Sequence, residues 1–383
     1  MTNENYIPRK QLKQLQKKVR PGKVTMILGA RRTGKTALIK EFLKDWSAQK
    51  YLLLNGEDLQ TQAMLQERNE ENYRRIISRR TLLVIDEAQK VPQIGSHLKF
   101  MVDSFSHLSV LVTGSSIFDL HQKLGEPLVG RSQSLYLYPL AQLELKAQEN
   151  YQQTQQKLEE RLIMGSYPEV NSVDDWEDKA DYLEELVNSY LLRDLLTFQG
   201  IRKAEKLLDL LRLLAHQIGG EVSIDELARS LSNISRNTVE HYLDLLSKVF
   251  VIYKVRGYSG NLRNEITKNP RWYFYDNGIR NALIRNFNPL KFRADQGMLW
   301  ENHLMSERLK YLDYHHKRVN RYFWRTYAQQ EIDLVEEESG TLRAYEFKWN
   351  PRKKITAPSA WRKHYARASF QVIHPQNHED FIT

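Results

Sequence analysis

The chain has 383 residues, a mass of 45.3 kDa, a mean hydropathy of −0.60 and a formal net charge of +10. This length exceeds one ordinary hydrophobic core, so we expect two or three domains, and no apolar run approaches the roughly 18 residues of a membrane span. The sequence contains no cysteine, which excludes disulfides, thiolate metal sites and a cysteine nucleophile. The first residues are polar and basic and lack the apolar segment of a secretory signal, so we expect a cytoplasmic protein with no membrane partner.

The charge is unevenly distributed along the chain. Residues 1–140 hold 22 Lys and Arg against 13 Asp and Glu, whereas residues 141–200 hold 5 against 13. Clustered Lys and Arg bind polyanions because they release the counterions of a phosphate backbone. The composition therefore favours nucleic acid as a partner, with solubility as the alternative explanation of the charge.

Apolar, strand-like runs alternate with helical stretches over the first 140 residues. The runs occupy residues 24–28, 51–55, 81–86, 110–114 and 135–139. Strands that alternate with helices are typical of a parallel α/β sheet. We therefore expect an α/β nucleotide-binding core at residues 1–140.

The loop after the first strand carries a phosphate-binding motif. GARRTGKT at Gly29 to Thr36 matches G-x-x-x-x-G-K-[ST] between a strand and the helical ALIKEFLKDW. Such glycines let backbone N–H groups surround the phosphates, while the lysine reaches the β and γ oxygens and the hydroxyl binds Mg²⁺. The nucleotide-binding residues expected here are Gly29, Arg32, Thr33, Gly34, Lys35, Thr36 and Ala37.

TLLVIDEAQ supplies the second half of the same site. Its apolar residues predict a buried strand that presents Asp86 to the metal, together with Thr36, and Glu87 to the attacking water. In the following VLVTGSS, we expect Ser115, in preference to Thr113 or Ser116, to lie between Asp86 and the γ-phosphate. The alternative for this residue is an ordinary turn at the end of a strand.

Beyond residue 140 the pattern becomes helical and acidic. Residues 141–200 are expected to form a helical lid and connector, which GSYPEV interrupts at Gly165 to Val170. In residues 201–287, Ser223 and Glu226 form a capping box and Ser235 can cap the next helix, so that two short helices and two strands predict a winged helix-turn-helix. Residues 288–383 begin with an amphipathic helix and continue with strands, which predicts an α+β domain.

Taken together, these motifs resemble the prokaryotic AAA+ ATPases whose C-terminal half carries a winged helix and a restriction-endonuclease-like domain. The stretches that carry the resemblance are YIPR, ILGARRTGKT, LLVIDEAQKVP, LVTGSS, LVGR, GSYPEV, YFYDNGIRNAL, GMLWENHL, EIDLV and YEFK. The resemblance covers nearly the whole chain. It implies a P-loop NTPase that uses ATP and Mg²⁺ and has a link with nucleic acid.

Two further residue roles follow from the resemblance. Arg131, just before LYLYP, stands where an AAA+ ATPase places the arginine finger that acts on a neighbouring subunit's nucleotide. This role implies a homo-oligomer, with a hexamer as one form, and the alternative is a surface arginine. GSYP resembles the element that replaces a sensor-two arginine in signalling-type AAA+ proteins, which implies that Pro168 lies near the nucleotide base.

The winged helix offers a modest DNA-binding surface. In the second helix we expect Val239, Tyr242, Leu243, Leu246 and Val249 to be buried, which leaves Arg236 and Asn237 outside to contact bases or phosphates. Glu240 and Asp244 on the same outer face would be repelled by DNA. We therefore expect binding to the backbone through the basic residues of the wing, Lys254, Arg256, Arg263 and Lys268. The alternative is a helix-turn-helix used only for packing.

The C-terminal strands carry the residue pattern of a PD-(D/E)XK nuclease. Asp333 lies in EIDLV, and alternation along YEFKW places Glu346 and Lys348 on one face. Glu301 would complete the set, in which acids hold Mg²⁺ and the lysine polarises water. The alternatives are a DNA-binding surface without turnover and an ordinary solvated hairpin. Basic residues surround this stretch in the sequence: Arg321, Arg325, Arg352, Lys353, Lys354, Arg362 and Lys363.

The main hypothesis is a Mg²⁺-dependent AAA+ ATPase that couples hydrolysis to binding or remodelling of branched, single-stranded or duplex DNA. Lys35, Glu87 and Arg131 are its expected catalytic residues. The second hypothesis is an ATP-gated, metal-dependent DNA endonuclease. The third is a signalling switch that binds a protein partner according to its nucleotide state.

Overall fold

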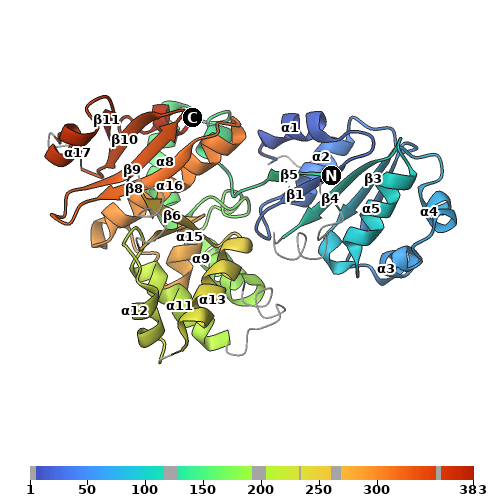
Figure 1. Cartoon of the computed structure of the whole chain (residues 1–383), viewed down its shortest axis with the longest axis horizontal. Helices are drawn as coiled ribbons and strands as arrows, with labels where there is room; N and C mark the ends of the chain where they lie inside the picture. Colours follow the sequence, from blue (N-terminus) through green and yellow to red (C-terminus); the bar gives the residue numbers. More distant parts are fainter. Residues whose placement is uncertain are drawn as a thin grey trace. The chain divides into compact units, whose positions relative to one another are not determined.

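The computed structural model describes residues 6–115, 128, 130–191, 204–232, 234–259, 269–350 and 355–383. The chain divides into two compact units (Figure 1). The first comprises Met1–Tyr138 and Lys248–Phe250, and the second comprises Pro139–Ser247 and Val251–Thr383. None of the described helices is both long and apolar enough to cross a lipid bilayer.

The first unit is built on a five-stranded sheet in the order β2-β3-β4-β1-β5, in which every pair is parallel. Its strands are β1 (Val24–Leu28), β2 (Tyr51–Asn55), β3 (Leu82–Asp86), β4 (Ser109–Gly114) and β5 (Ser132–Tyr136). The parallel α/β sheet that the sequence predicts is thereby confirmed. Because β1, β3 and β4 are neighbours, their carboxyl ends meet at one edge of the sheet.

The fifth strand begins earlier than its apolar run predicts. β5 starts at Ser132 instead of residue 135, and only Leu135 among its five residues is fully buried. The strand lies at the edge of the sheet and pairs only with β1, so polar side chains are tolerated along it. The apolar Leu137 and Tyr138 are buried just beyond the strand.

Helices of the first unit pack on the sheet and hold the strand ends in place. They are α1 (Gln11–Lys18), α2 (Lys35–Leu43), α3 (Leu59–Gln66), α4 (Glu70–Ile77), the short 3₁₀ helix η1 (Ala88–Lys90) and α5 (Ile94–Ser104). Leu15 of α1 and Leu38 and Phe42 of α2 join Ile27 and Leu111 of the sheet in one core. Burying each such side chain stabilises the fold by about 1.5–3 kcal/mol.

The second unit carries a six-stranded mixed sheet in the order β11-β10-β9-β8-β6-β7. Its strands are β6 (Ile252–Gly257), β7 (Arg271–Phe274), β8 (Asn320–Arg325), β9 (Glu331–Glu338), β10 (Thr341–Phe347) and β11 (Ser369–Ile373). β6 pairs antiparallel with β7 and parallel with β8. The sheet therefore runs without interruption across the domain boundary expected at residues 287 and 288.

Helices before and after this sheet complete the α+β unit. They are α7 (Gln142–Leu145), α8 (Tyr151–Met164), α9 (Trp176–Glu185), the π-helical η3 (Leu186–Leu191), α11 (Ala204–His216), α12 (Ile224–Ser230), α13 (Arg236–Lys248), α15 (Asn277–Leu283), η4 (Leu290–Phe292), α16 (Gln296–Tyr314), α17 (Ser359–His364) and α18 (Glu379–Ile382). α16 contacts both β7 and β10 (Figure 1). Asn302 of α16 hydrogen-bonds both the N–H and the C=O of Phe274, at 2.8 and 3.1 Å, and so satisfies the edge of β7.

In residues 223–249 the expected helix caps and buried stripe are confirmed, and of the expected capping box the structure shows the contact of the Ser223 hydroxyl with the Glu226 N–H. Ser223 accepts the Glu226 N–H at 3.4 Å, and Ser235 accepts the Thr238 N–H at 3.1 Å. The five residues of α13 and its end that the sequence predicts to face the core are all buried: Val239, Tyr242, Leu243, Leu246 and Val249. Helices α11, α12 and α13 and the pair β6–β7 follow one another in the order expected from the sequence.

A buried carboxylate joins the GSYPEV segment to the DNG turn. Asp276 accepts the N–H of Ser166 at 2.7 Å and, as the N-cap of α15, the N–H groups of Gly278 and Ile279 at 2.8 and 3.3 Å. Gly165 has a φ of +73°, and a Cβ there would lie 1.9 Å from Asp276 Oδ1. Only glycine therefore fits where the two segments meet.

We expect Asp276→Ala to lower the free energy of unfolding of the second unit by about 2–4 kcal/mol, because it removes a helix cap and leaves buried N–H groups without an acceptor. Urea unfolding followed by circular dichroism measures this loss. Asp175→Ala is the matched control, since Asp175 caps α9 at the surface through Glu177 and Asp178. Its cost should stay near 1 kcal/mol, and equal losses for the two variants would contradict the role of Asp276.

Candidate functional site

The loop between β1 and α2 is held in a fixed shape by its own contacts. Gly34 has a φ of +92°, a conformation that favours glycine, and a Cβ at Gly29 would lie 2.1 Å from the carbonyl oxygen of Leu137. Arg9, which belongs to the YIPR stretch, donates to the carbonyl oxygens of Thr33 at 2.7 Å and Tyr138 at 2.6 Å. Thr33 donates to the Ala30 carbonyl at 2.8 Å. Contacts from Arg9 and contacts within the loop thus fix the conformation of the loop before any ligand binds.

The lysine of the loop is buried at the start of α2. Lys35 is only 4% exposed, and its ammonium donates to the carbonyl oxygens of Gly29 and Ala30, both at 3.0 Å. The N–H groups in the first turn of a helix carry partial positive charge, so this position favours an anion. Ala37 lies half-buried in the same turn, and Arg32 is exposed with a φ of +65°.

Asp86 at the end of β3 is the meeting point of three elements. Thr36 of α2 donates its hydroxyl to Asp86 Oδ2 at 2.6 Å, and Thr113 of β4 donates to Oδ1. Thr113 is fully buried and also accepts the Glu87 N–H at 2.9 Å. The structure therefore places Thr113, which sequence reasoning ranked behind Ser115, directly on the acid that is expected to bind the metal.

Glu87 is oriented by a glutamine that sequence reasoning did not single out. Gln89 is buried and donates to Glu87 Oε2 at 2.6 Å and to the Ser115 hydroxyl at 3.3 Å. Glu87 itself has a φ of +51°, so its backbone turns sharply after the strand. Ser115 thus contacts the residue that positions Glu87, and its expected place beside a γ-phosphate stays a prediction. The signal for Gln89 was a polar residue two positions after the acidic pair in DEAQ.

Arg131 lies at the opposite edge of the sheet from the loop. It immediately precedes β5, whose first residue pairs with Val24 at the start of β1, whereas the loop follows the end of β1. Five strand residues span about 17 Å. The Arg131 guanidinium pairs with Asp103 at 2.5 Å, and both side chains are about 40% exposed. This arginine therefore cannot reach the loop of its own unit.

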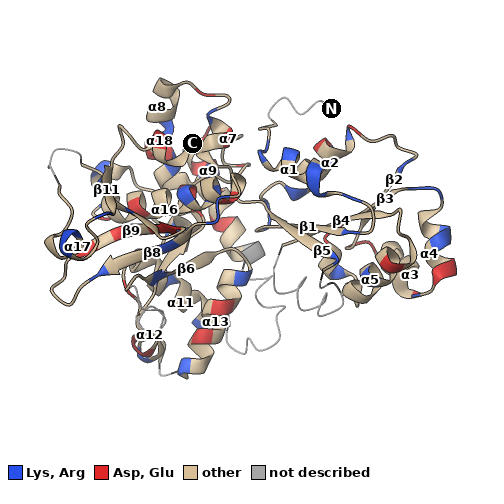
Figure 2. Cartoon of the chain, turned by 45° about the horizontal axis from the view of Figure 1, so that its top comes forward, with Lys and Arg blue, Asp and Glu red and all other residues tan. Residues whose placement is uncertain are grey.

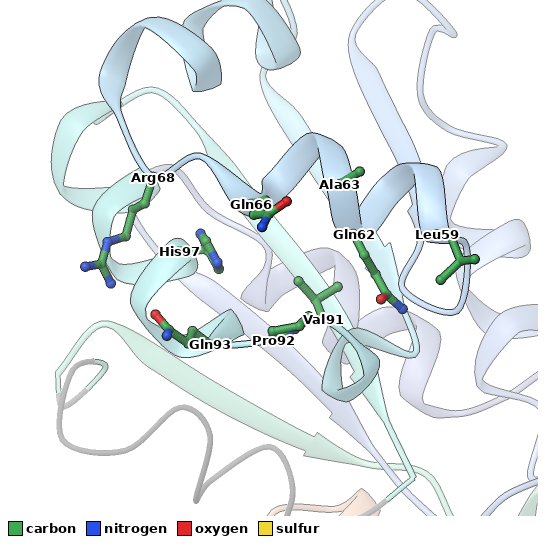
Figure 3. A pocket seen from close by; sticks show the side chains of 9 residues that line it. All are labelled: Leu59, Gln62, Ala63, Gln66, Arg68, Val91, Pro92, Gln93 and His97. Carbon is green, nitrogen blue, oxygen red and sulfur yellow. The ribbon is translucent and has the colours of Figure 1, made fainter.

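The first unit also contains a pocket of about 550 Å³ (Figure 3). Residues of α3, the connection from α3 to α4, the turn before α5 and α5 itself line it: Leu59, Gln62, Ala63, Gln66, Arg68, Val91, Pro92, Gln93 and His97. His97 hydrogen-bonds Tyr73 at 2.5 Å. Burial raises the pKa of Tyr73 to about 12, and it lowers the pKa of His97. None of the expected nucleotide-binding residues lines this pocket.

In the second unit the four expected nuclease residues come together. Glu301 lies on α16, Asp333 on β9, and Glu346 and Lys348 at the end of β10, where Lys348 pairs with Glu346 at 2.6 Å. Burial, together with the charges of Glu301 and Glu346, raises the pKa of Asp333 well above its usual range. Sequence reasoning missed Arg271 of β7, whose guanidinium faces Glu301 and Asp333 at 3.6 and 3.9 Å.

The expected DNA-binding residues divide into two groups. Arg236 is engaged in ion pairs with Asp225 at 2.9 Å and Glu240 at 3.1 Å, and Asn237 beside it is exposed. Lys254 and Arg256 lie exposed on one face of β6, where their alternation places them side by side. The expected basic residues Arg263, Lys268, Arg352, Lys353 and Lys354 lie outside the described part of the chain.

Pro168 belongs to the second unit, in the segment that Asp276 anchors through Ser166. Its expected place near the base of a nucleotide is therefore still a prediction. The neighbouring Tyr167 is buried, which raises its pKa well above the usual range.

Three family models match successive parts of the chain. Residues 21–146 match the AAA domain, residues 155–290 match a domain of unknown function, DUF8612, and residues 296–381 match another domain of unknown function, DUF4143. The AAA match contains both the loop and the Asp86–Glu87 pair.

The curated relatives are about one quarter identical to the chain over the residues that align. An uncharacterized protein of Mycobacterium tuberculosis (strain ATCC 25618 / H37Rv) is 26% identical over 308 residues, which cover 78% of this chain and 65% of the relative. An uncharacterized protein of Haemophilus influenzae is 25% identical over 283 residues, covering 68% of this chain and 69% of the relative. The chain thus aligns with only about two thirds of the length of these relatives.

Among solved structures, a DNA replication initiation factor shares 15% identity, with a TM-score of 0.27 and coverage of 62% of this chain and 85% of that chain. Cdc6p from Pyrobaculum aerophilum shares 15% identity, with a TM-score of 0.28 and coverage of 66% and 90%. TM-scores this low support no inference about function.

The strand, the phosphate loop and the acidic strand end all lie within the AAA match, so the chain carries an AAA+ domain with the P-loop fold at residues 21–146, together with a C-terminal domain of unknown function at residues 296–381.

Proposed function

We propose that the protein hydrolyses ATP in a Mg²⁺-dependent reaction and couples this hydrolysis to binding or remodelling of DNA, in branched or single-stranded form. The observation that carries the proposal is the contact of Thr36 with Asp86 beside the buried Lys35. It brings a hydroxyl, a carboxylate and an ammonium to the N-terminus of one helix, which is the set of groups that phosphate and its metal require.

The residues present fit a magnesium-bound nucleotide. Thr36 and Asp86 would hold Mg²⁺, because both offer oxygen ligands and their oxygens lie 2.6 Å apart. When bound, the ion neutralises charge on the phosphate oxygens. Lys35 would exchange its two carbonyl partners for phosphate oxygens. Thr113 keeps the Asp86 carboxylate in one orientation by its hydrogen bond to the second oxygen.

Glu87 is the candidate general base. Its carboxylate takes the proton of the attacking water, and Gln89 fixes the carboxylate at 2.6 Å so that it does not rotate freely. Because Gln89 also contacts Ser115 of the next strand, the base and the strand end are aligned with each other. The roles of Lys35, Asp86 and Glu87 thus divide into phosphate binding, metal binding and proton transfer.

Arg131 supports an oligomer. It lies at the sheet edge away from its own loop, so the nucleotide that it stabilises must belong to another copy of the chain. In the single chain its charge is balanced by Asp103, an exposed pair that contributes little to stability. A partner subunit's phosphate would compete with Asp103 for the guanidinium.

DNA binding is supported by the basic surface of α17 and its flanks. Residues 355–368 contain Arg362, Lys363 and Arg367 and no acidic residue, and these three cations are exposed. Figure 2 shows positive residues on α17, whereas negative residues are prominent on α13. We therefore assign the phosphate contacts to α17 and to Lys254 and Arg256 of β6, with the net charge of +10 as the long-range attraction.

Glu87→Gln should abolish turnover, lowering the rate of ATP hydrolysis by about 10²–10⁴-fold, because the amide cannot accept the proton of the water. ATP affinity should be retained, since Lys35 and Thr36 are unchanged. Phosphate release and fluorescent-nucleotide binding measure the two quantities. Glu71→Gln, an exposed acid of α4, is the control and should behave as the wild type. Normal hydrolysis by Glu87→Gln would refute the assignment.

Arg131→Ala should lower hydrolysis by about 10³-fold or more while ATP still binds. Asp103→Ala breaks the same ion pair but keeps the arginine, so it should hydrolyse ATP normally. Mixing Arg131→Ala with Glu87→Gln should restore activity above that of either variant alone, because sites with an intact Glu87 then face an intact Arg131. Absence of this recovery, with both variants folded, would argue against action between subunits.

Replacing Arg362 and Lys363 by Glu should weaken binding of single-stranded, duplex and four-way DNA alike, and should reduce the dependence of log Kd on log salt by about 1–2. Basal ATP hydrolysis should persist, while its stimulation by DNA should be lost. Fluorescence anisotropy and a coupled ATPase assay measure both effects. The charge-matched control replaces Lys13 and Lys17, which are exposed on α1. No DNA affinity in the wild type at low ionic strength would refute the coupling.

A further inference from the structure

A buried arginine lies within the carboxylate cluster of the second unit. Arg271 of β7 is 4% exposed, and its guanidinium lies 2.9 Å from Glu331 Oε2, 3.6 Å from Glu301 Oε1 and 3.9 Å from Asp333 Oδ1. The side chain stacks at 4.6 Å on the ring of Phe323. One fixed positive charge is therefore shared among three carboxylates from α16 and β9.

Protein donors also contact several oxygens of this cluster, whereas Glu346 Oε2 is buried without a hydrogen-bond partner. Tyr273 donates its hydroxyl to Glu301 at 2.7 Å, and the backbone N–H of Phe347 donates to Asp333 at 2.7 Å. Glu346 pairs with Lys348 at 2.6 Å. Arg271 and Tyr273 are two residues apart on β7, so they point to the same face and reach the same acid.

A loop and the surrounding fold also cover the acids Glu301 and Asp333. The loop after α11 lies against the cluster, because a Cβ at Gly219 would be 2.9 Å from Glu301 Oε1. Glu221 of this loop forms a β-bridge with Arg271. The side chains of Asp333 and Glu301 are only 8% and 17% exposed. On this side of the cluster, a phosphodiester would have to displace the loop to reach Glu301.

The residues do not fit a divalent metal. Mg²⁺ needs about six oxygen ligands at roughly 2.0–2.1 Å in octahedral geometry. With Arg271 in place, no three Asp, Glu, His or Cys side chains in the part of the chain that the structure describes are arranged to hold an ion. A guanidinium within 4 Å of two of the acids would, in addition, repel a second cation.

We infer that the guanidinium of Arg271 takes the place of the divalent cation in this nuclease-like centre, which is therefore a closed ion-pair network that does not cleave DNA. Its task is to fasten β7 to β9, β10 and α16. Burial lowers the pKa of Arg271, but the surrounding charges outweigh this effect and raise it overall, so the side chain stays positive. The inference is independent of the proposed ATPase activity.

The first test compares the wild-type chain with Asp333→Asn. Titration with Mn²⁺ by calorimetry should give the same number of sites in both, because the nucleotide site is common to them and the cluster contributes none. Neither protein should nick plasmid or branched DNA in the presence of Mn²⁺ or Mg²⁺. A Mn²⁺ site or a cleavage activity that depends on Asp333 would overturn the inference.

The second test removes the internal cation. Arg271→Met should lower the Tm, because three acids then lack their partner, and Mn²⁺ at about 100 times Kd should raise the Tm of this variant by about 5 °C more than that of the wild type. Arg308→Met is the matched control, since Arg308 pairs with Glu336 at 2.7 and 2.8 Å in another buried ion pair of the same unit. It should lose stability without recovery by Mn²⁺. A folded Arg271→Met without this gain would also overturn the inference, and if Arg271→Met does not fold, the first test decides.

Discussion

The nucleotide site depends on one carboxylate that connects three elements, β3, α2 and β4, through its hydrogen bonds. Asp86 stands at the end of β3, and its two oxygens accept hydroxyl groups from Thr36 on α2 and Thr113 on β4. These contacts exist because the parallel register brings the carboxyl ends of β1, β3 and β4 to one edge of the sheet. A shift of one residue in β3 or β4 would turn Asp86 or Thr113 to the other face of the sheet and break their contact. The buried core fixes the register of the strands, and this register decides which side chains meet at the site.

The second unit depends instead on buried charged groups whose partners come from other elements of the fold. Asp276 caps α15 and holds Ser166, Arg308 faces Glu336, and Arg271 is shared among acids. Burying such groups costs several kcal/mol in desolvation, and their attraction offsets the cost only when the geometry is good. Each pair therefore tolerates a single arrangement of the elements that it joins. These contacts join the segments Pro139–Ser247 and Val251–Thr383 into one compact unit.

The sequence was informative wherever a short stretch fixes its own geometry. The loop from Gly29 to Thr36, the caps at Ser223 and Ser235 and the buried stripe of α13 are local patterns, and they are found where they were expected. Thr113, Gln89 and Arg271 could not be assigned in this way, because their partners are set by strand order and packing across the fold. Strand β5 shows the same limit, since its pairing with β1 overrode its apolar pattern. The continuity of the second sheet across residue 288 likewise has no local signal.

The guanidinium of Arg9 connects two distant segments of the first unit. One of its nitrogens holds the carbonyl of Thr33 inside the phosphate loop, and the other holds the carbonyl of Tyr138, the residue at which the chain leaves the first unit. Charge-assisted bonds of this kind are short and resist stretching. One planar guanidinium therefore links the backbone of the phosphate loop directly to the residue at which the chain passes into the second unit.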